Sequence, residues 1–164
     1  MDFQPKGSSM EPQNNDAVYE RVKKDHAEKT EQMLLLKSSL PYLSDKKKLE
    51  DIAQVVDFFK RKVMAHFQWE DRDVFPMALA VGDLEFKKMI RQLQIQHILM
   101  IGNFDVLADI VLHHGFHFED EKVKKQFVDT ASEIIETMLQ HAQIEDERLY
   151  AYLRSKGVSL TPSF

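Results

Sequence analysis

The pattern His-x-x-x-Glu-Asp occurs twice in this chain, and it limits the possible folds more than any other feature of the sequence. One copy runs from His66 to Asp71 and the other from His141 to Asp146. Residues four positions apart lie on one face of an α-helix, so the imidazole and the glutamate of each copy can reach the same point. Two helices that carry this pattern can therefore bring two imidazoles and two carboxylates to the interior of a helical bundle.

The rest of the chain favours helix as well. It contains only 5 glycines and 5 prolines, and the stretches between them are rich in unbranched residues that lose little side-chain freedom on a helix. With 164 residues, of which 43% are hydrophobic, the chain is long enough for one domain with a substantial core. Apolar residues recur at helical spacing at about 16–39, 45–81, 83–114 and 119–156. Four long helices with short connections predict an all-α fold, an antiparallel up-down-up-down four-helix bundle.

Individual residues mark the expected helix ends. Pro41 cannot continue the first helix, because it lacks an N–H group and restricts the residue before it. Ser44 and Asp83 are the expected N-caps of the second and third helices. Gly115 and Gly157 tolerate positive φ and are expected to end the third and fourth helices.

The predicted domain organisation is a disordered lead-in at 1–14, the bundle at 15–157 and a C-terminal tail at 158–164. The lead-in is polar and has no apolar core of a signal peptide, and no apolar run approaches the ~20 residues that span a bilayer. We therefore expect a cytoplasmic protein that does not bind membranes. The formal net charge is −5 and there is no basic stripe, so we expect no nucleic-acid partner.

Two further histidines complete a twofold arrangement. His26 precedes His66 by 40 residues, and His97 precedes His141 by 44 residues. Each half of the chain thus supplies one isolated histidine and then the His-x-x-x-Glu pair. The six candidate metal ligands are His26, His66, Glu70, His97, His141 and Glu145.

The candidate ligands lie on apolar helix faces, which favours metal binding. Two buried glutamates without partners would cost several kcal/mol each, and a dinuclear cation neutralises them. Cysteine is absent, so any metal must be held by nitrogen and oxygen. Such ligands also accept manganese or zinc. Four imidazoles and two bridging carboxylates leave room for an additional ligand, as a reactive metal site requires.

Two segments resemble the motifs of the hemerythrin-like (HHE cation-binding) family. One is His66–Asp71 followed by Val74-Phe75-Pro76, and the other is His141–Glu147. The resemblance covers about residues 16–155. It implies two non-haem iron ions joined by an oxo or hydroxo bridge. In this arrangement His26 and His66 bind one iron, His97 and His141 bind the other, and Glu70 and Glu145 bridge them.

The sequence departs from the oxygen-carrying hemerythrins at Ile101, where those proteins have a fifth histidine one turn after the third-helix ligand. This departure leaves one iron a further open position. The absence of cysteine also separates the chain from iron-centre repair proteins that carry an N-terminal cysteine-bearing segment. Ferritin-like proteins use Glu-x-x-His pairs, whereas Gln94 lies three residues before His97 here.

The function expected first is a di-iron protein that engages oxygen or nitric oxide as sensor, scavenger or store. The alternative is a di-iron redox enzyme that reduces oxygen, peroxide or nitric oxide, or an iron-delivery or repair protein, with an unidentified electron donor or signalling partner. A metal-free helical interaction module is the third hypothesis. Tyr19 lies two turns before His26 on the same helix face, which suggests either a hydrogen bond from its hydroxyl into the site or packing in the core or at the surface.

Overall fold

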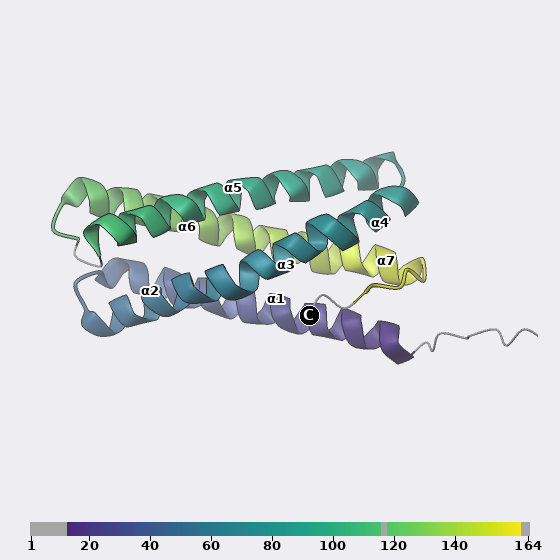
Figure 1. Cartoon of the computed structure of the whole chain (residues 1–164), viewed down its shortest axis with the longest axis horizontal. Helices are drawn as coiled ribbons and strands as arrows, with labels where there is room; N and C mark the ends of the chain where they lie inside the picture. The colour runs from purple at the N-terminus through teal and green to yellow at the C-terminus, as the bar shows by residue number, and fades with distance from the viewer. Residues whose placement is uncertain (1–12, 116–117, 162–164) are drawn as a thin grey trace, which may run out of the picture.

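The computed structural model describes residues 13–115 and 118–161, and within these ranges the chain is mostly helical and contains no strand (Figure 1). Four long helical segments lie side by side, joined by short connections. The first is α1 (Gln13–Ser39), followed by a 3-10 turn at Leu40–Tyr42; the second comprises α2 (Lys46–Phe58), α3 (Met64–Trp69) and α4 (Phe75–Val81); the third is α5 (Leu84–His114); the fourth comprises α6 (Glu121–Ile144) and α7 (Ala151–Ser155). Residues 1–12 and 162–164, most of the expected lead-in and part of the expected tail, lie outside the described residues.

Three π-helical segments connect the α-helices of the second and fourth segments without breaking them. They are Phe59–Val63, Glu70–Val74 and Glu145–Tyr150. Two of the three begin at a glutamate of the His-x-x-x-Glu-Asp pattern. A π-helical turn contains an extra residue relative to the α-helix and often occurs at functional sites.

The second helix begins one residue later than the sequence suggested. The carboxylate of Asp45, not the hydroxyl of Ser44, accepts a hydrogen bond from the backbone N–H of Lys48 at 3.0 Å. The backbone N–H of Asp45 in turn donates to the carbonyl of Tyr42, so that Ser44 lies inside the preceding turn and cannot cap the helix. The prediction of Ser44 as the N-cap was therefore wrong.

The other predicted helix ends are confirmed. Asp83 caps α5 by accepting a hydrogen bond from the N–H of Phe86 at 2.9 Å. Gly115 and Gly157 follow the ends of the third and fourth segments with φ of 61° and 65°. These positive φ values are strained for residues that carry a Cβ atom.

Two apolar clusters fill the bundle on either side of a polar layer. One contains Met33, Phe59, Phe104, Phe127 and their neighbours, with the rings of Phe59 and Phe104 stacked 4.0 Å apart. The other contains Trp69, Phe75, Ile90, Leu149 and their neighbours. In each of the four segments the candidate ligand lies in sequence between residues of one cluster and residues of the other. The ligands are thus enclosed at both ends by apolar side chains.

The described part of the C-terminal tail packs against the start of α1. The carbonyl of Val158 accepts hydrogen bonds from the Tyr19 hydroxyl at 2.8 Å and from the Asn15 amide at 3.1 Å. Leu160 is buried and its N–H donates to the Asn15 side chain. The indole N–H of Trp69 donates to the carbonyl of Thr161 at 2.9 Å. The tail therefore closes this end of the bundle.

Among the described residues, α5 is the one helix that is long and apolar enough to cross a membrane by length and composition alone. It carries the buried side chains of Gln96 and His97 and packs against α6. These contacts indicate a helix of the bundle core and not a membrane span.

Candidate metal centre

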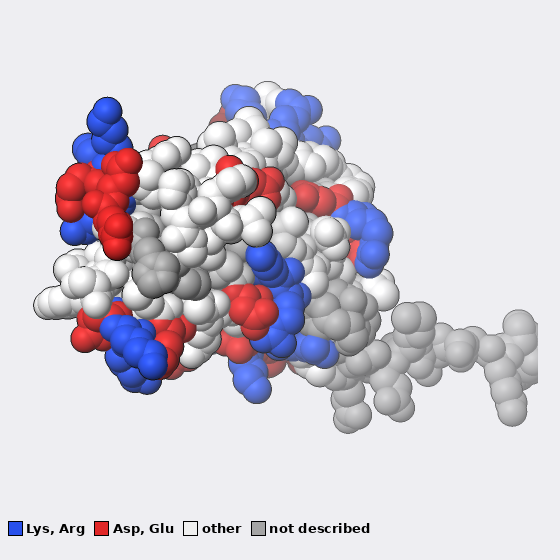
Figure 2. Space-filling view, turned by 60° about the vertical axis from the view of Figure 1, so that its left-hand side comes forward, with Lys and Arg blue, Asp and Glu red and all other residues white. Residues whose placement is uncertain are grey.

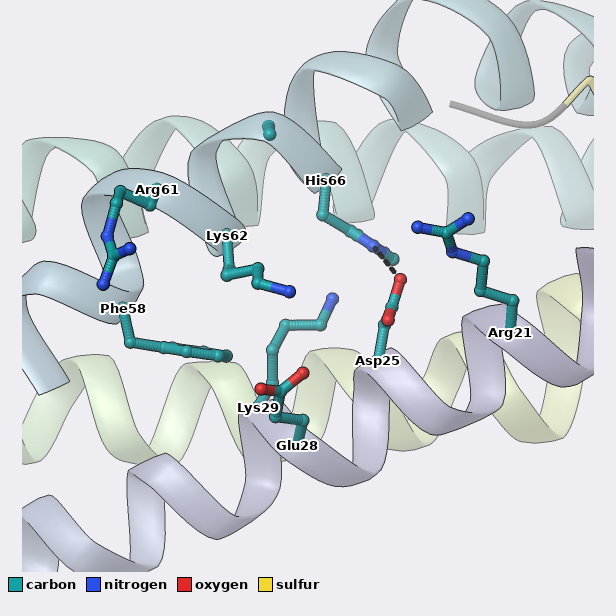
Figure 3. Close-up of a pocket in the computed structure, with 9 residues that line it drawn as sticks. Arg21, Asp25, Glu28, Lys29, Phe58, Arg61, Lys62 and His66 are labelled. Carbon is teal, nitrogen blue, oxygen red and sulfur yellow. Dashed lines mark ion pairs between the residues drawn. The ribbon is translucent and has the colours of Figure 1, made fainter. Parts of the chain in front are cut away.

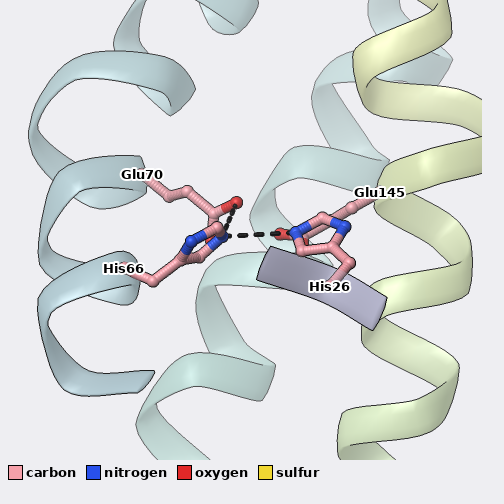
Figure 4. A group of neighbouring side chains, drawn as sticks. All are labelled: His26, His66, Glu70 and Glu145. Carbon is pink, nitrogen blue, oxygen red and sulfur yellow. Dashed lines mark hydrogen bonds and ion pairs between the residues drawn. The ribbon is translucent and has the colours of Figure 1, made fainter. Parts of the chain in front are cut away.

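The structure brings all six predicted ligands together in the polar layer. Each is at most 3% exposed. They form two groups of four that share the two glutamates, and in each group one ligand atom per residue lies within 4.8 Å of the others. The first group is His26, His66, Glu70 and Glu145, and the second is Glu70, His97, His141 and Glu145. Figure 4 shows the first group, with His66 and Glu70 on one helix facing His26 and Glu145. Each group could hold one metal ion.

The imidazole pairs have the spacing of ligands to a common ion. Nε2 of His26 lies 3.2 Å from Nε2 of His66, and Nε2 of His97 lies 3.0 Å from Nε2 of His141. Two neighbouring ligands of one octahedral ion at bond lengths of about 2.1 Å are about 3.0 Å apart. The geometry of both pairs therefore fits a metal ion held by Nε2 atoms.

The two glutamates lie between the pairs. Glu70 places Oε1 at 2.9 Å from His66 Nε2 and Oε2 at 3.3 Å from His97 Nε2. Glu145 places Oε1 at 2.8 Å from His141 Nε2 and Oε2 at 3.2 Å from His26 Nε2. Each carboxylate thus faces both histidine pairs, one oxygen to each, which is the arrangement of a bridging ligand.

Several of these buried atoms lack hydrogen bonds among the described residues. Glu70 Oε2 and both carboxylate oxygens of Glu145 have none, although imidazole nitrogens lie close by. An unsatisfied buried carboxylate is costly, because it has lost its hydration without replacement. Cations at the two groups would satisfy these oxygens, so the residues present fit a dinuclear centre.

A second layer of polar side chains orients the imidazoles through their Nδ1 atoms. Nδ1–H of His26 donates to Asp146 Oδ1 at 2.6 Å, and Nδ1–H of His97 donates to Asp71 Oδ1 at 3.1 Å. These aspartates directly follow the two glutamates in the sequence. Such hydrogen bonds fix the tautomer in which Nε2 is free to bind a metal. The aspartate of each motif therefore orients the isolated histidine of the other half of the chain.

The residues before the isolated histidines have the complementary role. Gln96 Oε1 accepts a hydrogen bond from His141 Nδ1 at 2.9 Å, and Asp25 Oδ2 lies 3.9 Å from His66 Nδ1. Sequence reasoning missed all four of these polar partners. The repeated aspartate after each glutamate was the available signal, whereas nothing in the sequence distinguished Asp25 or Gln96 from other polar residues.

Tyr150 supplies the hydroxyl group that one of the two alternatives assigned to Tyr19. The Tyr150 hydroxyl donates to Glu70 Oε1 at 2.5 Å, and its side chain is buried. The Tyr19 hydroxyl instead donates to the carbonyl of Val158 and its side chain is buried in the apolar cluster, so of the two alternatives for Tyr19 the structure shows packing. The Tyr19 ring still packs edge-on against the Tyr150 ring, with centroids 6.3 Å apart.

Charges in the layer shift the acidities of its members. Burial opposes ionisation of Glu70, but the charge of His66 and hydrogen bonds hold the pKa of Glu70 well below its usual value. Burial also opposes protonation of His97, yet the carboxylates of Asp71 and Glu70 outweigh it and raise the pKa of His97 to about 9. Burial and the nearby Glu70 carboxylate raise the pKa of Tyr150 well above its usual value. The layer is therefore built around negative charge that attracts cations.

Aromatic rings separate the centre from solvent. Phe67 stacks on His97 with centroids 3.9 Å apart, and Phe75 lies 5.2 Å from the same imidazole. Trp69 packs edge-on against His66 at 5.7 Å. These contacts fix the imidazole planes and lower the local polarity, which strengthens charge interactions inside the site.

Comparison with known proteins agrees with the geometry. The model of the hemerythrin HHE cation-binding domain matches residues 17–153, a range that contains all six clustered side chains. Searches of curated proteins and of solved structures found no match. The chain therefore belongs to the hemerythrin HHE cation-binding family.

Proposed function

We propose that this protein binds two non-haem iron ions and engages oxygen or nitric oxide as a sensor, scavenger or store. In this proposal His26 and His66 hold one ion, His97 and His141 hold the other, and Glu70 and Glu145 bridge them, with an oxo or hydroxo group completing the bridge. The supporting observation is that each glutamate directs one oxygen to each histidine pair. When bound, the ions supply open positions for a small ligand and a change of oxidation state.

The residues of this chain have defined tasks in such a centre. Asp71 and Asp146 hold the isolated histidines in the ligating tautomer. Phe67 and Phe75 exclude water on the side of His97. Ile101, half-buried and one turn after His97, offers no ligand atom, which supports an open position on that side.

Elemental analysis of the purified protein tests the assignment. We expect about two iron ions per chain after anaerobic loading with ferrous iron. Replacement of Glu70 or Glu145 by alanine should abolish dinuclear loading, since each removes a ligand from both ions. Retention of two ions by both variants, or a wild-type chain that never holds metal, would contradict the proposal.

The alternative function is a redox enzyme that reduces oxygen, peroxide or nitric oxide with an external electron donor, or an iron-delivery or repair protein. Tyr150 favours the redox enzyme, because its buried hydroxyl places a hydrogen-bond donor on a carboxylate that would bridge the two ions. The optical spectrum of the ferrous protein after addition of oxygen separates the two functions. A band that reverses on degassing supports reversible binding, whereas irreversible conversion together with turnover supports the enzyme.

The order of the helices and the surface charge support further parts of the proposed function. The short connections after α1, α4 and α5 support the antiparallel up-down-up-down order. Acidic and basic side chains are interspersed on the face shown in Figure 2, which with the net charge of −5 supports a protein without a nucleic-acid partner. We place the protein in the cytoplasm, where an electron donor or signalling partner would meet it.

A further inference from the structure

Lys29 is a buried cation that the proposed metal ligands do not account for. It lies on α1 three residues after His26, it is 2% exposed, and its Nζ atom has no hydrogen-bond partner among the described residues. The ring of Phe67 lies beside it, with its centroid 5.8 Å from Nζ, and the carboxylates of Asp25 and Glu70 feel its charge without accepting a hydrogen bond from it. A buried ammonium group without an acceptor is costly. The ammonium group therefore lacks a hydrogen-bond acceptor among the described residues.

The Lys29 side chain lines a pocket of about 200 Å³ between α1 and the second helical segment. Figure 3 shows Lys29 and Lys62 reaching into the space between these helices, with Asp25 and His66 beside them. The lining has four cationic and two acidic side chains; they are Arg21, Lys29, Arg61 and Lys62, and Asp25 and Glu28. Because Arg61 is also paired with Asp57, the net excess of positive charge around the pocket is one.

His66 connects the pocket with the metal centre. Its ring lines the pocket, and its Nδ1 atom lies 3.9 Å from Asp25 Oδ2. Its Nε2 atom faces His26 and Glu70 on the other side. A ligand in the pocket would therefore lie against one imidazole of the His26–His66 pair.

The other half of the chain has no equivalent cation. Met100 follows His97 by three residues, as Lys29 follows His26, and Met100 is fully buried in the apolar cluster. Among the described residues, the one buried lysine or arginine side chain therefore lies on the side of the His26–His66 pair. The two halves of the chain have the same types of candidate metal-binding side chain, but only the first half has a buried lysine beside them.

We propose that this pocket binds a small inorganic oxyanion of a single negative charge beside the metal centre, with Lys29 as its buried counter-charge. The inference rests on the proposed function, because the bound ions supply the remaining positive charge. A volume of about 200 Å³ admits an anion of the size of nitrite or bicarbonate together with water. The anion accepts hydrogen bonds from Nζ of Lys29 and Lys62, which satisfies the buried ammonium group.

Calorimetric titration of the metal-loaded full chain with nitrite tests this site. We expect Lys29→Met, which copies the residue at position 100, to weaken nitrite binding at least tenfold with two metal ions retained. Lys24→Met is the matched control, because it removes the same charge from the exposed face of the same helix and should leave nitrite affinity unchanged. Lys62→Gln, an exposed position in the pocket wall, should weaken binding a few-fold without a risk to folding.

Two results would overturn the inference while the proposed function stands. One is a wild-type chain that holds two ions and does not bind nitrite at millimolar concentration. The other is an unchanged nitrite affinity in both Lys29→Met and Lys62→Gln. A wild-type chain that holds no metal contradicts the proposed function itself, and elemental analysis of the same samples identifies that case.

A second inference rests on a separate observation, the outer face of α5. Several large apolar side chains on this helix are exposed to solvent; they are Leu84, Ile95, Ile98, Leu99, Val106 and Leu112. Ile98 is 70% exposed and Leu112 is 79% exposed. A row of apolar residues along one exposed helix face is typical of an interaction surface.

The charged residues on this face are arranged symmetrically about Ile98. Arg91 lies seven residues before Ile98 and Asp105 lies seven residues after it. Leu84 and Leu112 lie fourteen residues before and after it. In an antiparallel pair of α5 helices centred on Ile98, Arg91 of each copy would lie beside Asp105 of the other, and Leu84 beside Leu112. Arg91 and Asp105 have no ion-pair partner within the described part of the chain.

We infer that two copies of this chain form a twofold-symmetric dimer through α5. The interface is isologous, so each charge pair and each leucine pair occurs twice. Sedimentation between micromolar and submillimolar concentration should show a monomer–dimer equilibrium. Arg91→Glu alone and Asp105→Arg alone should each raise the dissociation constant at least tenfold, and the double variant should restore it.

Arg72→Glu is the control, because it reverses a charge on an exposed side chain that is not part of α5 and should not change dimerisation. A chain that stays monomeric at every concentration overturns the inference. A dimer that is indifferent to both single reversals overturns it equally.

Discussion

Phe75 and Tyr150 occupy equivalent positions in the two halves of the centre, each five residues after a clustered glutamate, and they differ by one hydroxyl group. The Phe75 ring lies 5.2 Å from the imidazole of His97, and the Tyr150 ring lies 5.7 Å from that of His26. The additional hydroxyl donates a hydrogen bond to Glu70. The two groups of candidate ligands therefore have unequal surroundings, although the ligands are of the same types.

Tyr150→Phe should make the halves equal at this position and weaken the metal-free protein. A hydrogen bond to a charged acceptor contributes about 1.5–3 kcal/mol, so we expect the free energy of unfolding at pH 7 to fall by about that amount. Denaturant unfolding of chelator-treated protein measures it. Tyr152→Phe, which removes a hydroxyl bonded to the Val81 carbonyl near the surface, should cost less than about 1 kcal/mol. Equal losses in both variants would contradict the contribution of the Tyr150 hydroxyl.

Asp146→Asn and Asp71→Asn should each weaken metal binding by about 10- to 100-fold, because partners of this kind hold an imidazole in its ligating tautomer. Asp146→Asn should affect the ion beside His26, and Asp71→Asn the ion beside His97. Competition with a chromogenic chelator measures the loss of each ion. Asp73→Asn, whose carboxylate pairs with Arg72 at the surface, should leave both affinities unchanged. If either variant lost both ions to the same extent, Asp71 and Asp146 would not have separate effects on the two ions.

Metal loading should become more favourable as the pH rises toward 9. The pKa of His97 is raised to about 9 in the metal-free site, so a metal must displace a proton from this imidazole at lower pH. The same pKa shift predicts that the stability of the metal-free protein falls as the pH rises. Protonated His97 stabilises the fold below about pH 6.5, and this contribution is lost as the pH rises through 9. Chelator competition and denaturant unfolding at matched pH values measure the two trends, and parallel trends would contradict the argument.

Removal of metal should lower the melting temperature. Each ion present at about 100 times its dissociation constant stabilises the native state by about 2.7 kcal/mol. For a chain of this size that corresponds to about 5–10 °C per ion. Scanning calorimetry before and after chelation measures the shift, with the Glu70→Ala variant as the control that should show little change. A wild-type chain whose melting temperature ignores chelation would show that the buried carboxylates are satisfied without metal.

The clustering of the ligands could be predicted from the sequence because it depends on local geometry and on a repeat. His66 and Glu70 share a helix face by their four-residue spacing, and the second copy repeats it at His141 and Glu145. Apolar residues on both sides of each ligand then require that these faces meet inside the bundle. The helix ends at Asp83 and Gly115 followed from equally local chemistry.

The surroundings of the ligands could not be predicted, because they depend on how the helices rotate and where the tail packs. Tyr19 and Tyr150 both lie on faces that reach toward the site, and the carbonyl of Val158 decides which hydroxyl remains available for Glu70. The burial of Lys29 depends on the segment that packs over α1. A sequence pattern normally places such a lysine on a solvated face.

The crossed hydrogen bonds of Asp71 and Asp146 have a consequence for how the molecule could be divided. A chain cut between Gly82 and Asp83 would yield two fragments, each with one histidine pair and one glutamate. Each fragment would lack the aspartate that orients its own isolated histidine, since that aspartate belongs to the other fragment. Under the proposed function neither piece alone would hold an ion as the intact chain would, so the absorption of bound iron would measure the association of the two fragments.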